Sequence, residues 1–244
     1  MSNSGAVSGY LDVLLAGDRV ACRELMQKEV AAARSARSVY FDLLWPAMGE
    51  VEQLYRANRI NRAAEHMATR ILRVSADQLQ ASLTSQPANG KRILIGCADD
   101  EPEELGAQMC ADLFESAGWS VYFIGGGVPN DEILSLVGQL RPTVLLLFGT
   151  QPQGVPGVRR LIDLIHDVDS NPTMNIMISG GVFNRADGLW KEVHADLFAP
   201  TAAEALEMAD AAEPRKPQVR APGAPKKRRR RRRPPLLAAM QASD

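Results

Sequence analysis

The chain has 244 residues, 45% of them hydrophobic, which is enough to bury the core of one or two domains. Its charge is uneven: residues 214–244 hold eleven basic residues and one acid, and residues 1–213 hold 17 basic and 28 acidic ones, so the two parts carry +10 and −11. The sequence shows no apolar run of membrane-spanning length, no signal peptide at its start and no disulfide framework among its three cysteines. We therefore expect a cytoplasmic protein without a membrane span.

Residues 8–84 predict a helical cap bundle. A short helix and three longer ones are expected from the helical spacing of apolar residues, the longer ones at 18–34, 38–59 and 60–83. Asp18 is placed to cap the first long helix, with Val20 on its apolar face. The apolar face of the last helix is expected to hold Ile60, Ala64, Met67, Ile71, Val74 and Leu79. Together these segments indicate an antiparallel four-helix bundle.

After a linker at 85–90, residues 91–212 alternate between apolar strands and helices. The expected strands lie at 92–97, 119–125, 143–149, 175–181 and 196–199. Such alternation indicates an α/β domain with a five-stranded, parallel, doubly wound (flavodoxin-like) sheet. Ligands of these sheets lie outside the carboxyl ends of the strands. The candidate loops are therefore 98–105, 125–129, 149–155 and 180–185.

The first of these loops reads DDEPEELG, so it offers carboxylates and neither a histidine nor a phosphate cradle. Its acids are suited to a hard cation, or they are solvated and favour the N-terminus of the next helix. The glycine run at 125–127 does not follow the first strand, as a dinucleotide fingerprint requires. His166 and His194 are isolated, and we expect both to be structural. We assign no metal site and no catalytic residue from these patterns.

A helical bundle followed by such a domain, with SGGVFN after the fourth strand, is similar to the cobalamin-binding module. This module occurs in methionine synthase, corrinoid methyltransferases and light-sensing transcriptional regulators. In the photoreceptor-type members, a tryptophan precedes a Glu-His pair on the helix that caps the upper face of the corrin ring. The sequence YRANRINRAAEH places Tyr55 before Glu65 and His66 here. The resemblance implies that these three residues contact cobalamin.

The resemblance covers about residues 8–212 and also assigns a role to the SGG segment. Ser179, Gly180 and Gly181 match the place where a glycine pair lets the backbone approach the nucleotide tail of the cofactor. The family motif Asp-x-His-x-x-Gly, whose histidine ligates the cobalt from below, is altered. Aligned on Gly106, it has Glu101 at the aspartate position and Glu103 at the histidine position. A carboxylate matches cobalt less well than an imidazole, so the usual lower ligand is missing.

A second departure follows the third strand, where the family carries small polar residues beside the nucleotide tail. Phe148 stands at the family's serine position, and its ring is expected to fill the slot for the tail. Gly149 and Thr150 compensate only in part. If a cobalamin or related tetrapyrrole binds, the base-on form or a ligand from the bundle, such as His66, is therefore favoured.

Three functions remain open from the sequence. The first is a non-enzymatic regulatory or sensory module of the cobalamin-binding type, which works with a partner regulator or enzyme. The second is an interaction module for protein or nucleic acid that kept the fold and lost the cofactor. The third is a corrinoid carrier subunit of a methyltransferase, against which the missing lower histidine argues.

Residues 213–244 are rich in proline and arginine and predict a disordered tail. Within it, KKRRRRRR attracts polyanions. The cations of this run are Lys226, Lys227, Arg228, Arg229, Arg230, Arg231, Arg232 and Arg233. Because no aromatic residue is interleaved, nonspecific nucleic-acid binding is expected in place of base readout. The alternatives are a solvated tail that contacts the acidic body and a different anionic partner.

Overall fold

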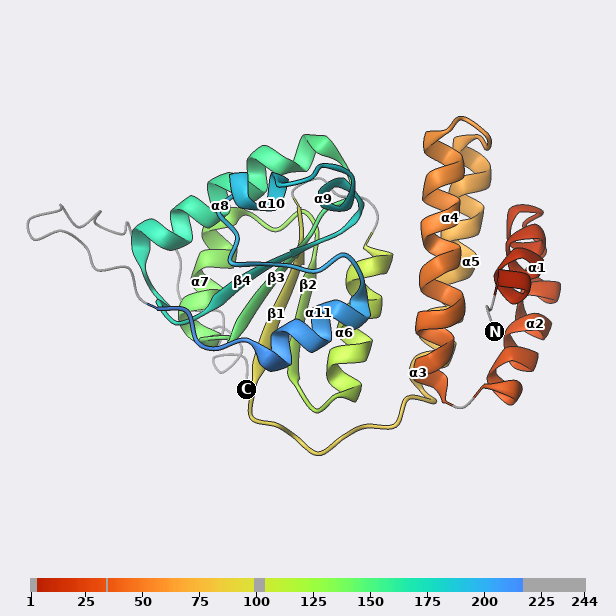
Figure 1. Ribbon diagram of the computed structural model, residues 1–244, viewed down its shortest axis with the longest axis horizontal. Coiled ribbons are helices and arrows are strands. Elements are labelled where there is room, and N and C mark those ends of the chain that lie inside the picture. The colour runs from red at the N-terminus through yellow and green to blue at the C-terminus, as the bar shows by residue number, and fades with distance from the viewer. Residues whose placement is uncertain (1–3, 34, 99–103, 217–244) are drawn as a thin grey trace, which may run out of the picture.

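A computed structural model describes residues 4–33, 35–98 and 104–216 of the chain. They form a helical cap and an α/β domain, which lie side by side and are joined by an extended segment (Figure 1). Glu101, Glu103 and the basic run of the tail lie outside the described residues. What the sequence predicts for them therefore stays a prediction.

The N-terminal cap is helical, as predicted. Its elements are α1 (Ser4–Leu15), α2 (Arg19–Ala32), α3 (Ala36–Val39), the π-helical turn η1 (Tyr40–Leu44), α4 (Trp45–Arg56) and α5 (Arg62–Gln80). The Asp18 carboxylate accepts hydrogen bonds of 3.0 Å from the N–H groups of Val20 and Ala21. Asn61 accepts one of 2.9 Å from Ala64 at the start of α5. These side chains satisfy backbone donors that have no partner within a helix, and the predicted cap at Asp18 is confirmed.

The buried faces of two cap helices differ from the prediction. Val20, Met67 and Val74 are 56%, 47% and 38% exposed, so placing them on a buried face was wrong. On α2, the buried residues are Cys22 and Met26. The buried residues of α5 are Ala68, Ile71, Leu72, Ser75, Ala76 and Leu79. Ile71 and Leu79 of the predicted face are thus buried, so the prediction is confirmed in part. Small side chains make up half of the buried face and allow close helix packing.

The α/β domain contains the predicted five-stranded parallel sheet. Its strands are β1 (Arg92–Cys97), β2 (Ser120–Gly125), β3 (Val144–Phe148), β4 (Asn175–Ser179) and β5 (Leu197–Phe198). They are ordered β2-β1-β3-β4-β5, and every neighbouring pair is parallel. Strand β1 lies between β2 and β3, so the connection from β1 to β2 and the connection from β2 to β3 run in opposite directions across the sheet. The carboxyl ends of β1 and β3 therefore border the crevice where open α/β sheets bind ligands.

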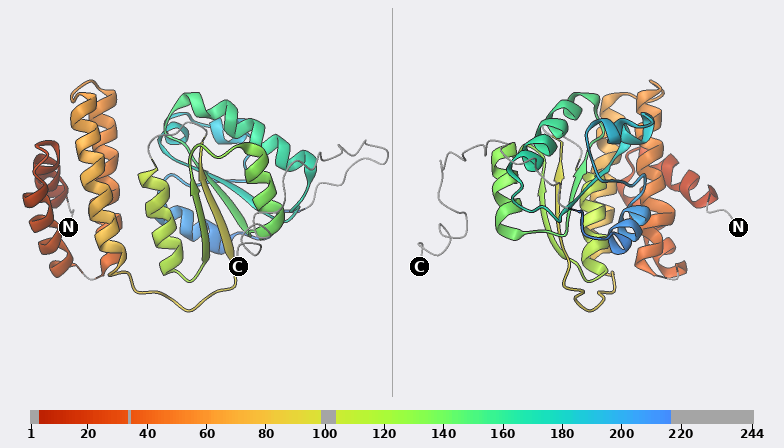
Figure 2. Two further views of the ribbon diagram at one scale, coloured as in Figure 1. Left: turned by 180° about the vertical axis from the view of Figure 1, so that it is seen from behind. Right: turned by 60° about the vertical axis from the view of Figure 1, so that its left-hand side comes forward.

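Helices cover both faces of the sheet (Figures 1 and 2). On the face toward the cap lie α6 (Leu105–Ser116) and α11 (Ala202–Ala211), and on the opposite face lie α7 (Asn130–Leu140) and α8 (Val155–Val168). Three short helices complete the domain: η2 (Pro152–Gly154), α9 (Gly181–Arg185) and α10 (Leu189–Glu192). Among the described residues, no helix is both long enough and apolar enough to cross a membrane.

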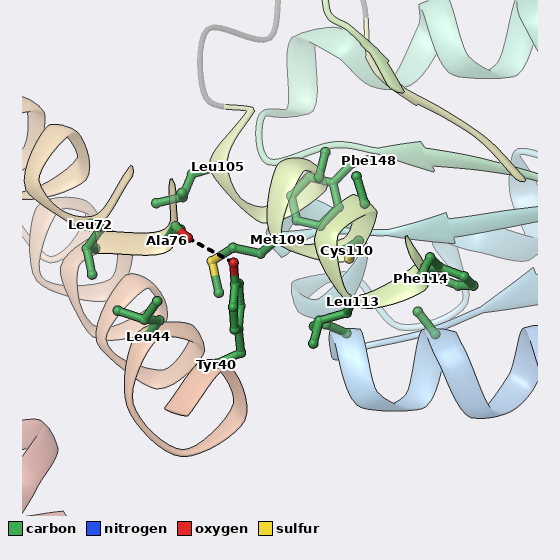
Figure 3. Packing of buried hydrophobic residues seen from close by; sticks show 14 of the residues in the cluster. Tyr40, Leu44, Leu72, Ala76, Leu105, Met109, Cys110, Leu113, Phe114 and Phe148 are labelled. Carbon is green, nitrogen blue, oxygen red and sulfur yellow. Dashed lines mark hydrogen bonds between the residues drawn. The ribbon is translucent and has the colours of Figure 1, made fainter. Parts of the chain in front are cut away.

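The cap packs directly on α6, and a single buried apolar cluster runs through both parts of the molecule (Figure 3). Leu44 and Leu72 of the cap belong to the same cluster as Leu105, Met109 and Leu113 of α6. Burying such side chains contributes about 25 cal/mol per Å² of apolar surface. The cap is thus fixed to the α/β domain along α5 and α6 by a shared core.

Polar contacts also lie in this interface between the cap and α6, which we call the seam. The Tyr40 hydroxyl is 2.8 Å from Asp112 Oδ2 and 3.0 Å from the carbonyl oxygen of Ala76. Asp112 is only 5% exposed. Its burial, opposed by the Tyr40 hydrogen bond and reinforced by nearby acids, raises the pKa of the carboxyl from 3.8 to about 6. The seam therefore contains a titratable group whose charge is costly to bury.

Candidate functional site

A pocket of about 300 Å³ lies between the cap and the carboxyl ends of the strands. Helices α4 and α5 form its cap wall. The start of α6, the end of β3 and the segment after β4 form its sheet wall. The pocket thus lies at the crevice that the strand order defines, and the helical cap forms the wall opposite the strand ends.

The cap wall is built from one face of α4 and the first turns of α5. Trp45, Glu52 and Tyr55 line the pocket from α4, where a spacing of seven and three residues brings them to one side of the helix. Glu65 and His66 line it from α5. Their side chains approach within 3.5 Å, and the His66 side chain is 48% exposed. The cap wall therefore presents aromatic rings and a half-exposed imidazole beside a carboxylate.

His66 is the histidine that the pocket contains. His166 lies in α8, where burial lowers its pKa. His194 lies near Asp163, with 3.1 Å between Nδ1 and Oδ1. Neither of these two lines the pocket, and no cluster of three or more His, Cys, Asp or Glu suited to a metal occurs in the part of the chain that the structure describes. His66 is therefore the histidine that could hold a metal-containing cofactor within the pocket.

The sheet wall contains glycines that allow unusually close backbone contacts. Gly180 has a φ of +105°, and a Cβ atom there would overlap the backbone of Gly149. A Cβ on Gly181 would overlap the side chains of Arg185 and Glu52. Only glycine fits position 180 without strain, whereas the atoms met at position 181 are the ends of two flexible side chains. The glycine pair singled out in the sequence therefore brings this wall into contact with the loop after β3 and with α4.

Phe148 lies at the base of the pocket and is 3% exposed. Its ring meets Trp45 edge-on, with 6.4 Å between the ring centroids, and a Cβ on Gly106 would overlap it. Behind it, the hydroxyl of the buried Ser179 donates a 2.8 Å hydrogen bond to the carbonyl oxygen of Ala199. The slot predicted for a nucleotide tail is thus filled by packed protein atoms.

Arg185 joins the two walls at the rim of the pocket. Its guanidinium forms an ion pair with Glu52 of α4 and donates a 2.6 Å hydrogen bond to the carbonyl oxygen of Thr150. Neither this contact nor α9 is predicted by the sequence, because a helix of five residues gives almost no periodic signal. The sequence does place Arg185 four residues after Gly181, a spacing that brings two residues to the same face of a helix.

The described end of the acidic loop has a structural role. Glu104 Oε1 accepts a 2.6 Å hydrogen bond from the N–H of Gly126. Gly125 has a φ of +64°, and a Cβ there would overlap the Glu104 carboxylate. The glycine run at 125–127 therefore serves to wrap one loop around an acid of the other.

The sequence-predicted residues thus fall into three groups. Those that line the pocket are Tyr55, Glu65, His66, Gly106, Phe148, Thr150, Gly180 and Gly181. Gly149 and Ser179 are buried directly behind the sheet wall, and Glu101 and Glu103 lie outside the described residues. The surroundings of the pocket fit the ring of a corrinoid, which glycine backbone can approach from one side and an imidazole from the other. The filled slot behind Phe148 does not fit an inserted nucleotide tail.

Models of the B12 binding domain match this chain over residues 7–80 and again over residues 91–210. The chain therefore belongs to the B12-binding family, with a helical cap and a Rossmann-like domain, and the predicted resemblance is confirmed. Dimethylamine corrinoid protein 1 of Methanosarcina acetivorans is 23% identical over 165 residues, which are 66% of this chain and 76% of that protein.

Two further proteins show how widely this architecture is used. The HTH-type transcriptional repressor CarA of Myxococcus xanthus is 29% identical over 89 residues, or 36% of this chain and 31% of that repressor. The monomethylamine corrinoid protein of Methanosarcina barkeri has a similar fold, with a TM-score of 0.76, 18% identity, and coverage of 85% of this chain and 98% of that one. The similarity in fold therefore extends across both the cap and the α/β domain.

Proposed function

We propose that this chain binds a corrinoid ring in the pocket between cap and sheet and carries it for a partner enzyme. The observation that supports this most directly is the meeting of His66 and Tyr55 of the cap with the glycine pair at the strand ends, across one pocket. The long match to a dimethylamine corrinoid protein favours the carrier role. In this proposal, the partner catalyses any transfer of a methyl group.

Each wall has a defined task in this proposal. A bound corrinoid would supply a cobalt ion. His66 of the cap would hold it, since a neutral imidazole is a good ligand for such a metal. The Glu65 carboxylate beside it would orient the imidazole, as acidic groups next to metal-ligating histidines commonly do. Tyr55 would contact the ring from the cap, and the glycine pair would let the sheet approach it.

Titration of the full-length protein with aquocobinamide and hydroxocobalamin, followed by visible absorbance, tests this proposal. His66→Ala should change the bound spectrum and weaken binding by roughly tenfold or more, since even the partners of metal ligands contribute that much. His194→Ala is a matched control, because the His194 side chain is 52% exposed compared with 48% for His66. It should bind as the unmodified protein does.

Circular dichroism would verify that both variants keep the helical fold. Failure of the unmodified protein to bind either corrinoid would refute the proposed function and favour the cofactor-free interaction module. An unchanged spectrum and affinity in folded His66→Ala would remove His66 as the ligand.

A regulatory or sensory module is the second candidate. It is favoured by the Tyr55, Glu65 and His66 pattern on the cap and by the local match to a transcriptional repressor. A carrier should retain its corrinoid while the cobalt is reduced with titanium(III) citrate and then methylated with iodomethane. A regulator should change its shape or oligomeric state on loading, which small-angle scattering of the free and loaded forms would detect. These measurements separate the two roles.

A further inference from the structure

The interior next to the pocket already has the packing of a finished protein core. Phe148 is held between Gly106 on one side and Trp45 on the other. Protein interiors are close to crystalline in density, and a buried ring leaves such a position only if its neighbours also move. An inserted ligand arm would therefore have to displace the Phe148 ring and disturb its contact with the cap.

The backbone groups behind Phe148 are also hydrogen-bonded to one another. The N–H of Gly149 donates to the carbonyl oxygen of Ser179 at 3.0 Å, and the N–H of Val182 donates to that of Gly149 at 3.3 Å. The Ser179 hydroxyl donates its hydrogen bond to the carbonyl oxygen of Ala199. Donors that a nucleotide arm would need are thus already bonded within the chain, and breaking these bonds in a buried place is costly.

We infer that this site takes a corrinoid ring whose nucleotide arm stays outside the α/β domain, with Phe148 as the residue that excludes the arm. This inference rests on the proposed function. The ligand class is either a corrinoid that lacks the nucleotide, such as cobinamide, or a complete corrinoid whose arm remains in solvent. In both cases, the ring carries the affinity and the arm adds little.

The first test compares the affinities of the unmodified full-length protein for aquocobinamide and hydroxocobalamin by absorbance titration. We expect cobinamide to bind at least as tightly as cobalamin. A preference for cobalamin of more than about fivefold would overturn the inference, because the arm would then contribute to binding. If neither corrinoid binds, the proposed function fails first. If both bind and cobalamin is strongly preferred, only this inference fails.

The second test removes the ring that fills the slot. Phe148→Ala should shift the ratio of the two affinities toward cobalamin by roughly tenfold. Phe114→Ala is the matched control: Phe114 is also fully buried, but its ring packs on Trp119 with 5.2 Å between centroids, and it does not line the pocket. This control should leave the ratio unchanged.

An unchanged ratio in folded Phe148→Ala would overturn the role of Phe148. If that variant does not fold, the comparison of the two corrinoids with the unmodified protein still decides the inference. Phe148→Leu, which retains most of the buried volume, then tests the residue itself and should show a smaller shift in the same direction.

Discussion

Replacing Asp112 by asparagine should make the folded protein more stable at neutral and alkaline pH. Burial raises the pKa of Asp112 from 3.8 to about 6 in the folded state, so folding favours the protonated carboxyl. The Tyr40 hydroxyl has one proton but two neighbouring acceptors, the carboxyl oxygen at 2.8 Å and the Ala76 carbonyl at 3.0 Å. A protonated Asp112 can donate to Tyr40, which can then donate to Ala76. An asparagine amide can do the same at any pH.

The magnitude follows from the pKa. Below pH 3.8 the carboxyl is protonated in both the folded and unfolded states, and the stabilising contribution is fully present. It is lost as the pH rises from 3.8 to about 6, because in this range the unfolded state ionises while the folded state keeps its proton; above about 6 both states ionise and the loss is complete. The complete loss corresponds to a ceiling of about 3 kcal/mol, at 1.36 kcal/mol per pKa unit. Relaxation around the charge lowers the expected effect to about 1 to 2 kcal/mol.

Urea unfolding at pH 4 and pH 8 measures this effect. Asp112→Asn should differ little from the unmodified protein at pH 4 and exceed it in unfolding free energy at pH 8. Asp12→Asn on α1 is the control, since it makes the same chemical change at an exposed residue. Equal stability of Asp112→Asn and the unmodified protein at both pH values would refute the argument about the buried charge.

Three further predictions concern the backbone, the rim and the tail. Gly180→Ala should lower the unfolding free energy by about 1 to 3 kcal/mol in urea titrations, because φ is +105° there; unchanged stability would contradict the close contact with Gly149. Arg185→Ala should speed amide hydrogen exchange in α4 near Glu52 while changing global stability by less than about 1 kcal/mol, and unaltered exchange would mean that the rim contact is idle. Deleting residues 225–244 should abolish salt-sensitive, sequence-independent DNA binding in fluorescence anisotropy, whose log–log salt slope is about −0.9 per phosphate contacted; binding that survives would place the nucleic-acid site in the folded body.

The sequence predicted the fold well where hydrophobic runs are long and bounded by clear signals. The segment VLLLF of β3 is buried throughout. In a chain whose apolar runs alternate with helices, such a run predicts a buried strand of a parallel sheet. The buried face of α5 was predicted only in part: Ile71 and Leu79 are buried, whereas Met67 and Val74 remain partly exposed because alanine and serine pack there. Propensity and periodicity count apolar bulk, whereas helix contacts also depend on how closely the backbones approach.

Site residues that belong to a recognisable motif could be predicted from the sequence. Residues whose role depends on neighbours far away in the chain could not. Gly180 and Phe148 could be singled out because the resemblance to the cobalamin-binding module marks both positions. Trp45 of the cap wall was not singled out, although it contacts Phe148 from more than a hundred residues away. Arg185 and Glu52 likewise meet only after cap and sheet have packed together. Contacts of this kind come from tertiary structure and leave no spacing in the sequence.

The two edges of the cap are held with unequal strength, and this bears on how a ring would enter. The two walls of the pocket are joined along two edges. Along α5 and α6, the walls share a buried apolar cluster. At the rim, the partly exposed pair of Arg185 and Glu52 joins them, and such pairs contribute at most about 1 kcal/mol.

Opening at the rim therefore costs less than separation along the seam, and the cap should pivot about α5 and α6 without leaving the domain. His66 and Tyr55 lie on the cap and move with it, while Gly180 and Gly181 stay with the sheet. Such an opening would move His66 away from the sheet wall, so under the proposed function a contact between His66 and a bound corrinoid would favour the closed arrangement. A ligand can shift an equilibrium only by its difference in affinity for the two states. Under the proposed function, the strength of the His66 contact would accordingly determine how firmly a bound ring closes the cap.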